Sequence, residues 1–202
     1  MEQAFWDNRY AAGLVYGEAA NEFLVSMVSG RAARGATALD IGAGEGRNAL
    51  YLASLGYRTL AMDQSVVGMD KALKRARDRG LPDGSLRAVA ADLRDFQADP
   101  ESFDLISSIF VHLPQGLRAN VHANVARWLK PGGRFILEAY APEQLARNTG
   151  GPKDLALLAP LDVMLSELNG LTIEHAARAV RVVVEGSYHT GEADVVQVVA
   201  RK

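Results

Sequence analysis

The sequence predicts an α/β fold in which a doubly wound, mostly parallel sheet of seven strands carries helices on both faces and ends in an antiparallel hairpin. Three observations predict this fold. Short apolar runs alternate with helical stretches from residue 36 to residue 140. The run at residues 38–41 leads through glycines at alternate positions into a helical stretch. Two valine-rich runs close the chain and are joined by a glycine-containing segment, which is typical of a β-hairpin.

The first 30 residues differ from the rest because their pattern is helical. We expect helix over residues 2–28, in two pieces separated by a turn that Gly13 and Gly17 bracket. The apolar positions of this stretch include Phe5, Trp6 and Tyr10. These side chains are the natural candidates for packing against the sheet.

Strands and helices then alternate through the middle of the chain. Strands are expected at residues 36–41, 58–62, 86–90, 103–110 and 133–140, with helices at 46–55, 66–79 and 115–129. The first strands are apolar without strict alternation, as expected when helices cover both faces of a parallel sheet. The segment 130–133, Lys-Pro-Gly-Gly, should end a helix and start a strand, because proline cannot continue the helix and glycine permits the turn.

After residue 140 we expect a longer connection with a helix at 154–168. Strands at 171–185 and 193–201 then form the hairpin, joined by residues 186–191. A chain of 202 residues suits a single domain. Within residues 1–202 we distinguish an N-terminal helical part (1–30), a core (36–140) and a C-terminal part with a helix and the hairpin (141–202).

The composition is that of an ordinary globular protein, with 49% apolar and 23% charged residues and a net charge of −2. We therefore expect no nucleic-acid partner, and the basic stretch 71–79 is interpreted as a solvated helix face and not as a phosphate-binding track. The absence of cysteine excludes disulfides, thiolate nucleophiles and thiolate metal sites. No metal site, secretory signal or membrane span is expected, so a cytoplasmic location is predicted.

The glycine turn after residue 41 is the strongest functional signal. Asp40 is followed by Gly42, Gly44 and Gly46. Glycine permits positive φ and a close approach of the backbone to a ligand. The spacing G-x-G-x-G differs from the G-x-G-x-x-G of dinucleotide-binding folds, which favours another adenosyl cofactor over NAD. The alternative is a tight turn without a ligand.

Residues 39–46 resemble the first motif of the class I S-adenosylmethionine-dependent methyltransferases, which have a Rossmann-like fold. The resemblance implies S-adenosylmethionine as the cofactor. Gly42, Ala43 and Gly44 would pass beside its methionine part, and Asp40 would lie near its amino group. A carboxylate can accept hydrogen bonds from that ammonium.

Acidic residues at the next two strand ends extend this cofactor site. Asp63 can accept both hydroxyls of a ribose, although it could also cap the next helix, a role for which Ser65 is better placed. The resemblance implies that Asp92 faces the adenine amino group, with the Leu93 N–H available to a ring nitrogen; the alternative is a polar loop residue. The remaining expected cofactor contacts are Gln64 and Ile109.

Residues 108–114 depart from the Asn/Asp-Pro-Pro-aromatic motif of many methyltransferases that act on amino groups of adenine or glutamine. This departure favours small soft nucleophiles, or carboxyl and hydroxyl groups. His112 would lie beside the transferred methyl group and could orient or deprotonate the nucleophile. The alternative is a histidine at a helix start whose ring is bonded to the backbone.

A narrower resemblance connects the chain with the tellurite-resistance and thiopurine-type methyltransferases. It rests on residues 5–10, 16–17, 46–53, 130–133 and 200–202. It implies that Arg47 and His189 belong to the active site, Arg47 by holding an oxyanion or the cofactor carboxylate and His189 by binding the anion or moving a proton. Thr190 follows His189 at a position where that family carries arginine. The alternatives are a helix-surface arginine and a hairpin histidine without a function.

These observations predict transfer of a methyl group to a small molecule, such as a thiol or a selenium or tellurium oxyanion. Catalysis would rest mainly on proximity and the exclusion of water, with residues 1–30 as a lid that presents Trp6, Tyr10 and Tyr16. A non-catalytic S-adenosylmethionine sensor or partner subunit is the alternative from another class. A protein or nucleic-acid acceptor is less favoured. The sequence identifies neither the acceptor nor whether the protein is a monomer or a homodimer.

Overall fold

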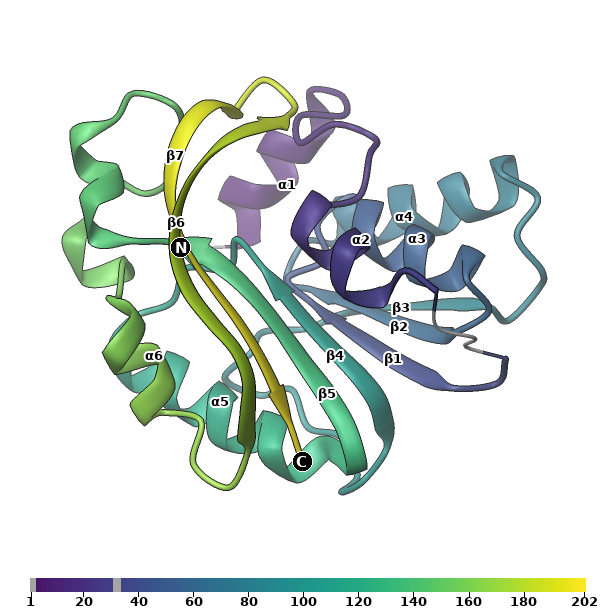
Figure 1. Cartoon of the computed structure of the whole chain (residues 1–202). Coiled ribbons are helices and arrows are strands. Elements are labelled where there is room, and N and C mark those ends of the chain that lie inside the picture. Colours follow the sequence, from purple (N-terminus) through teal and green to yellow (C-terminus); the bar gives the residue numbers. More distant parts are fainter. Residues whose placement is uncertain (1–2, 31–33) are drawn as a thin grey trace.

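The computed structural model describes residues 3–30 and 34–202. Residues 1–2, which begin the predicted N-terminal helical part, and residues 31–33 lie outside the described residues. Seven strands form one sheet in the order β3-β2-β1-β4-β5-β7-β6 (Figure 1). They are β1 (Thr37–Ile41), β2 (Arg58–Asp63), β3 (Leu86–Ala90), β4 (Phe103–Ile109), β5 (Leu129–Tyr140), β6 (Thr172–Glu185) and β7 (His189–Arg201). In this described sheet β7 alone runs opposite to the other six strands, which confirms the predicted fold class.

The strand order reverses beside β1, which pairs with β2 on one edge and with β4 on the other. The chain runs outward from β1 through β2 to β3 and returns to β4 on the opposite side. The connections that follow β1 and β4 therefore leave in opposite directions. Ligand crevices of open α/β sheets form at this point, outside the carboxyl ends of the strands.

Helices cover both faces of the sheet. They are α1 (Gln3–Ala11), α2 (Glu22–Val28), α3 (Arg47–Ser54), α4 (Val66–Asp78), α5 (Gln115–Trp128) and α6 (Leu161–Ser166). Successive strand residues point to opposite faces. Ala38 of β1 packs in a cluster with residues of α2 and α3, whereas Leu39 packs with residues of α5 and α6. Burial on both faces explains why the first strands lack a polar side.

Most predicted boundaries between residues 36 and 129 agree with the structure to within one residue. Two predictions at proline residues were wrong. The predicted helix 154–168 is divided into a 3-10 turn, η2 (Leu155–Leu157), and α6, because Pro160 disfavours helical geometry at the residue before it. Strand β5 begins at Leu129 and not at residue 133, since Pro131 and its neighbouring glycines lie within a strand whose pairing with β4 is shifted by an irregularity.

The C-terminal hairpin is longer and its turn is tighter than expected. Strand β7 begins at His189, which pairs with Glu185, so Thr190 and Gly191 belong to the ladder and not to the connection. The turn consists of residues 186–188 and has Gly186 at a φ of 73°. Three-residue hairpin loops commonly place glycine in this left-handed region. The tight turn brings His189 into a fixed position on a strand.

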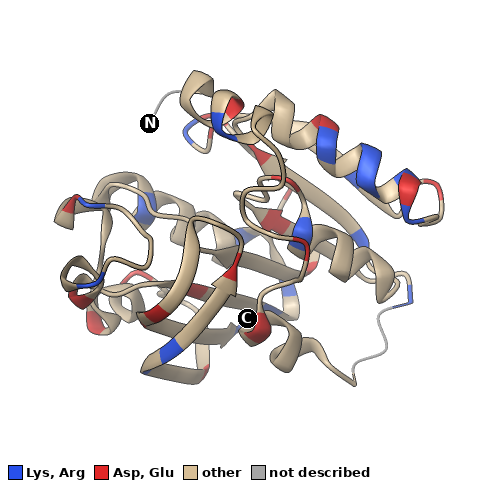
Figure 2. Ribbon diagram, turned by 90° about the horizontal axis from the view of Figure 1, so that it is seen from above, with Lys and Arg blue, Asp and Glu red and all other residues tan. Residues whose placement is uncertain are grey.

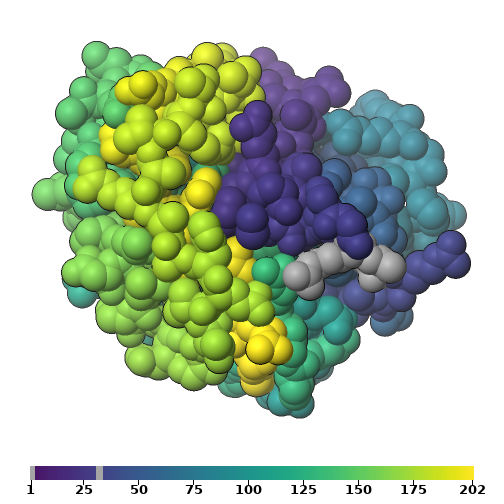
Figure 3. All heavy atoms as spheres, in the orientation of Figure 1, coloured from purple at the N-terminus to yellow at the C-terminus, as the bar shows by residue number. Residues whose placement is uncertain are grey.

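The N-terminal segment, which we define as residues 3–21, lies against this hairpin, as the adjoining purple and yellow-green surfaces in Figure 3 show. The Ser187 N–H donates to the Val15 carbonyl over 3.1 Å. A Cβ atom on Gly17 would lie 3.1 Å from the Gly186 nitrogen, so the two glycines allow the backbones to approach. The N-terminal segment and the turn of the C-terminal hairpin, which are far apart in the sequence, are therefore in contact.

Figure 2 shows Lys and Arg interspersed with Asp and Glu along the ribbon. The basic stretch at residues 71–79 lies mostly on α4, where Lys74 and Asp78 form an exposed pair of 2.6 Å. Within residues 3–30 and 34–202, none of the helices combines the length and the apolar character needed to cross a membrane.

Candidate active site

The glycine turn leaves the carboxyl end of β1 and leads into α3. Gly42, Gly44 and Gly46 all have positive φ angles, of 63°, 54° and 81°, which L side chains seldom adopt. A Cβ atom at Gly42 would lie 2.5 Å from Val111 Cγ2, and one at Gly44 would lie 2.7 Å from Tyr10 Oη. Glycine is therefore required both by the backbone conformation and by the close packing of neighbouring side chains.

A cavity of about 1220 Å³ opens at this turn and extends along the carboxyl ends of the strands. This volume exceeds the usual range for a single small-molecule site, about 300–1000 Å³. The cavity wall contains every residue predicted from the sequence except Asp40. These residues are Trp6, Tyr10, Tyr16, Gly42, Ala43, Gly44, Arg47, Asp63, Gln64, Asp92, Leu93, Ile109, His112 and His189.

Asp40 lies beneath the turn and is 1% exposed. Its Oδ1 accepts a hydrogen bond of 2.7 Å from the Ser107 hydroxyl, while Oδ2 has no hydrogen-bond partner among the described residues. Burial raises the pKa of Asp40 to about 7. The structure thus gives Asp40 a position behind the cavity wall, and its contact with a cofactor amino group stays a prediction.

Asp63 ends β2 and joins the turn to the start of α4. Its Oδ2 accepts the Gly44 N–H and its Oδ1 accepts the Ser65 N–H, each over 2.9 Å. Burial raises the pKa of Asp63, although these backbone hydrogen bonds oppose the shift. Ser65 caps α4 by accepting the Gly68 N–H. A carboxylate has about four acceptor sites, so Asp63 keeps some acceptor capacity for ligand hydroxyls.

Asp92 lies in the loop after β3 and pairs with its neighbour Arg94. Its carboxylate accepts the Arg94 N–H over 2.8 Å and the Arg94 guanidinium over 2.6 and 3.0 Å. These hydrogen bonds lower the pKa of Asp92 to about 2. The pairing with Arg94 was not predicted, and an adenine amino group would share the same carboxylate.

The N-terminal segment covers the glycine turn. Tyr10 is buried and stacks on Trp6 with ring centroids 5.7 Å apart. Asp7 accepts hydrogen bonds from the Ser65 hydroxyl and the Val67 N–H at the start of α4. Two carbonyls of the segment and the Glu45 carboxylate accept hydrogen bonds from Lys71, and Glu45 also accepts the Val15 N–H. The segment is thereby fastened to the turn that it covers.

His112 lies at the other end of the cavity, in a stack with Tyr140 and Phe110. Its Nε2 accepts the Tyr140 N–H over 3.1 Å, so the ring is bonded to the backbone, as in the second of the two predicted roles. Burial lowers the pKa of His112 to about 3, and the nearby His189 adds to this effect. A neutral ring whose Nε2 lone pair is engaged is a poor proton acceptor.

Phe110 was missed by the sequence analysis. It is a non-glycine residue with a φ of 55°, and its N–H donates to the Glu138 carbonyl over 2.7 Å. Its ring lies 4.6 Å from that of Tyr140 and 5.0 Å from that of His189. Strained backbone of this kind is typical of functional sites. The sequence contains no local signal for it, because phenylalanine does not favour this conformation.

His189 begins β7 and faces the same aromatic group. Its ring centroid lies 4.8 Å from that of Tyr16, and its Nδ1 is buried without a hydrogen-bond partner among the described residues. Burial, with the positive charges of Arg47 and Arg9, lowers the pKa of His189 to about 3. The hydroxyl of Tyr140, also buried, likewise has no partner in the described part of the chain. Two unused polar atoms therefore lie among the aromatic rings.

Arg47 begins α3 and is buried, in contrast to the surface position considered from the sequence. Its guanidinium pairs with Glu185 of β6 and donates to the Ala19 carbonyl over 3.3 Å. The guanidinium is thus held between the N-terminal segment and the hairpin. The sequence analysis did not predict this pairing, since the two partners are far apart in the chain.

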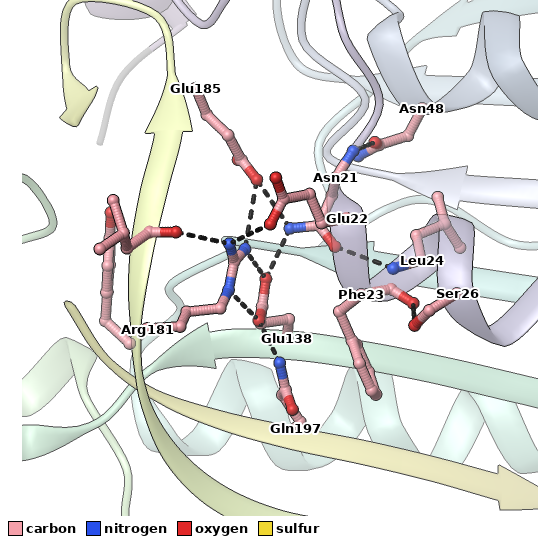
Figure 4. Close-up of polar contacts among 12 residues, drawn as sticks. Asn21, Glu22, Phe23, Leu24, Ser26, Asn48, Glu138, Arg181, Glu185 and Gln197 are labelled. Atoms are coloured by element: carbon pink, nitrogen blue, oxygen red, sulfur yellow. Dashed lines mark hydrogen bonds and ion pairs between the residues drawn. The ribbon is translucent and has the colours of Figure 1, made fainter. Parts of the chain in front are cut away.

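Glu185 belongs to a buried polar network beside the cavity (Figure 4). Asn21 Nδ2 donates to Glu138 over 2.5 Å and to Glu185 over 2.8 Å. Arg181 donates twice to Glu138, over 2.9 and 2.6 Å. The Asn21 N–H donates to Asn48 Oδ1 over 2.9 Å. The network joins the N-terminal segment, α3, β5 and the hairpin, and its charges are compensated within it.

The comparisons with known proteins agree with this geometry. Residues 38–133 match the methyltransferase domain family. The chain is 31% identical over 148 residues to a cypemycin N-terminal methyltransferase from a Streptomyces species, which covers 71% of this chain and 58% of that protein. The chain spans between 32% and 58% of the length of four curated relatives that it matches.

Solved structures show the same fold at low sequence identity. The protein studied in the conversion of a disulfide bond into a thioacetal group during echinomycin biosynthesis has a TM-score of 0.79 and 19% identity, over 99% of this chain and 91% of that one. TehB from Haemophilus influenzae has a TM-score of 0.73 and 16% identity, over 99% of this chain and 66% of that one.

The strand order of the sheet is that of the Rossmann-like methyltransferase fold. Residues 38–133, a little under half of the chain, are therefore similar to a methyltransferase domain, and the chain is similar to part of one curated methyltransferase at 31% identity.

Proposed function

We propose that this protein transfers the methyl group of S-adenosylmethionine to a small-molecule acceptor whose nucleophile is soft or already ionised, a thiol being the first choice. One observation carries the proposal. A single cavity has the glycine turn and Asp63 at one end and an aromatic group with two neutral histidines at the other. A cofactor and an acceptor can therefore lie in one continuous space.

The cofactor end fits S-adenosylmethionine. The remaining acceptor capacity of Asp63 suits ribose hydroxyls. The glycine turn allows a ligand to approach the backbone. When bound, S-adenosylmethionine supplies an activated methyl group on its sulfonium. We infer that the methionine part lies along Gly42–Gly44 and that the N-terminal segment acts as the lid, with Trp6 and Tyr10 excluding water.

The acceptor end offers little base catalysis. The Nε2 of His112 is already hydrogen-bonded, and His189 is too weak a base to deprotonate an alcohol. A thiolate needs no such help, so orientation and water exclusion suffice. His189 Nδ1 and the Tyr140 hydroxyl are the polar atoms that would orient the acceptor.

A selenium or tellurium oxyanion is the second acceptor class, in keeping with the resemblance of Arg47 and His189 to residues of the tellurite-resistance family. Its support is weaker, because Arg47 is already paired with Glu185. A guanidinium that is neutralised by a buried carboxylate is a poorer anion site than an unpaired one.

Calorimetry with S-adenosylmethionine, followed by turnover assays with thiols, selenite, tellurite and carboxylic acids, tests the proposal. We expect binding in the micromolar range and formation of S-adenosylhomocysteine with thiols. Binding without turnover of any acceptor would favour a cofactor sensor or partner subunit. No binding up to millimolar concentration would refute the cofactor site.

An Asp63→Ala variant tests the ribose contact. We expect the affinity for S-adenosylmethionine to fall at least about tenfold, since two hydrogen bonds to a charged group are lost. Asp63→Asn is the companion variant, because it retains an acceptor for one backbone N–H. Thermal unfolding establishes that both variants fold. Unchanged affinity in a folded Asp63→Ala variant would contradict the assignment.

A further inference from the structure

Arg9 is a cation of the cavity wall that has no carboxylate partner among the described residues. Four cationic side chains line this cavity: Arg9, Arg47, Arg94 and Lys153. Arg47 pairs with Glu185 and Arg94 pairs with Asp92. Arg9 is half-buried on α1, so its guanidinium is partly desolvated and is not neutralised by a carboxylate of the described residues.

The rings around Arg9 hold its guanidinium without using its hydrogen-bond donors. The Cζ atom lies 4.5 Å from the ring centroids of Phe5 and Tyr188 and 5.5 Å from that of Trp6. A cation–π contact of this kind attracts the charge to the ring face and does not require a hydrogen-bond acceptor. Within the described part of the chain, these donors make one hydrogen bond, from Nη1 to Tyr16 Oη over 3.0 Å.

The hydrogen bond and one of the ring contacts of Arg9 lead to the acceptor end of the cavity. Tyr16, which accepts its hydrogen bond, lies 4.8 Å from the ring of His189. Tyr188, on which it stacks, precedes His189 in the hairpin. Lys153 also lines this region, but it is exposed, and its Nζ donates to the Arg147 carbonyl. Asp154 is nearby and caps η2 by accepting the Ala156 N–H.

We propose that Arg9 binds an anionic group, preferably a carboxylate, that the methyl acceptor carries at a distance from its reacting atom. The planar edge of a guanidinium matches the two oxygens of a carboxylate. The rings of Tyr16 and Tyr188 provide a surface for an aryl or other flat acceptor. This inference rests on the proposed function and specifies the acceptor as an acidic molecule.

Binding of a matched pair of probes tests it. The full chain, saturated with S-adenosylhomocysteine, is titrated by calorimetry with 4-mercaptophenylacetate and with its primary amide, which has the same shape and the same thiol but no carboxylate charge. We expect the acid to bind about ten- to a hundredfold more tightly than the amide. In Arg9→Gln this ratio should fall to about twofold, and in Arg9→Lys, which keeps the charge but not the planar fork, it should be intermediate.

Lys153→Gln is the matched control, since it removes the other unpaired cation of the described wall and should keep the ratio of the unmodified protein. A purely structural role of Arg9, in which it joins α1 to the hairpin, would change thermal stability in Arg9→Gln but not the acid-to-amide ratio. Equal binding of the two probes, no binding of either, or loss of the ratio in Lys153→Gln in place of Arg9→Gln would overturn the proposal.

The proposed function has a separate readout in the same experiment. If S-adenosylhomocysteine fails to bind, the methyltransferase proposal fails, and the probe ratio can still be measured without it. If S-adenosylhomocysteine binds and thiols are methylated without a preference for the acid, only the role of Arg9 is refuted.

Discussion

At the scale of single residues, the acceptor pocket contains two histidines that stay neutral at physiological pH. Burial lowers the pKa of both His112 and His189 to about 3. Neither ring therefore titrates between pH 5 and pH 8, where an unperturbed histidine does. The pH dependence of methyl transfer in this range should therefore follow groups other than these histidines, namely the acceptor itself and Asp40, whose pKa is raised to about 7.

The buried His112 also makes stability depend on pH. Its folded pKa of about 3 is below the unfolded value near 6.5. The unfolded state therefore binds more protons between these values, and stability falls as the pH is lowered through this window. Between pH 7.5 and pH 5.0, one such group lowers the free energy of unfolding by about 2 kcal/mol.

Between pH 7.5 and pH 5.0, we expect the free energy of unfolding of His112→Gln to fall by about 2 kcal/mol less than that of the unmodified protein. Glutamine keeps an acceptor for the Tyr140 N–H but has no titrating ring. Urea unfolding at the two pH values measures the difference. The comparison cancels the opposite effect of Asp40, whose pKa is raised to about 7 in both proteins. Parallel stability curves would show that His112 does not titrate as its burial implies.

The sequence indicated which side chains suit an active-site role. It did not indicate which residues are their hydrogen-bond or ion-pair partners. His112 had two open roles in the sequence, and the Tyr140 amide that decides between them lies 28 residues away. Arg47 was expected at the active site, and it lines the cavity, but Glu185 is 138 residues distant. Such pairings depend on the complete fold.

At the scale of elements, the glycine turn and the helix after it could be predicted because their determinants are local. The three glycines supply the positive φ angles, and the apolar run before them is long enough for a strand. The region around Pro160 was mispredicted for the opposite reason. Apolar residues on both sides of the proline fit a helical pattern, and one backbone restriction overrides that pattern.

A comparison of Gly44 with Gly80 distinguishes the effect of close packing in the glycine turn from the effect of its positive φ angles. Gly44 and Gly80 have similar φ angles, of 54° and 64°, but a Cβ atom would meet Tyr10 Oη at Gly44 and nothing within 4 Å at Gly80. Substitution of Gly80 by alanine should therefore cost only the left-handed conformation, about 1–2 kcal/mol.

We expect Gly44→Ala to destabilise the protein more than Gly80→Ala, because Tyr10 must move as well. We also expect the affinity of Gly44→Ala for S-adenosylhomocysteine to fall about tenfold, or about 1.4 kcal/mol, while Gly80→Ala binds normally. Denaturant unfolding and calorimetry measure the two quantities. Equal losses of stability and equal affinities in the two variants would argue against a packing role of Gly44.

At the scale of the whole molecule, the polar network connects parts that are remote in the sequence. Charged residues within apolar strands, Glu138 in β5 and Arg181 in β6, are the signal that could have indicated it, since buried charges are nearly always paired. The sequence does not show which charges pair, because that depends on how β5, β7 and β6 are ordered in the sheet. The fold class follows from local patterns, whereas this network follows from topology.

Asn21 holds the network together at the end of the N-terminal segment. Its Nδ2 bridges Glu138 and Glu185, and its Oδ1 accepts the Leu24 N–H and so caps α2. Without the amide, two buried carboxylates each lose a donor, which is costly for charged groups. The segment that covers the cofactor end would then be held less firmly against α3 and the hairpin.

Asn21→Ser separates the two roles, because serine can cap a helix but cannot bridge the carboxylates. We expect the free energy of unfolding to fall by about 2 kcal/mol in Asn21→Ser and by about 3 kcal/mol in Asn21→Ala, which also removes the helix cap. Hydrogen exchange should be faster in residues 3–21 of both variants, while the amides of β1 and β4 keep their protection until global unfolding. If Asn21→Ser is as stable as the unmodified protein and its N-terminal segment exchanges no faster, the bridge does not fasten the segment. If exchange rises uniformly along the chain, the network stabilises the whole fold and has no particular role at the entrance to the cavity.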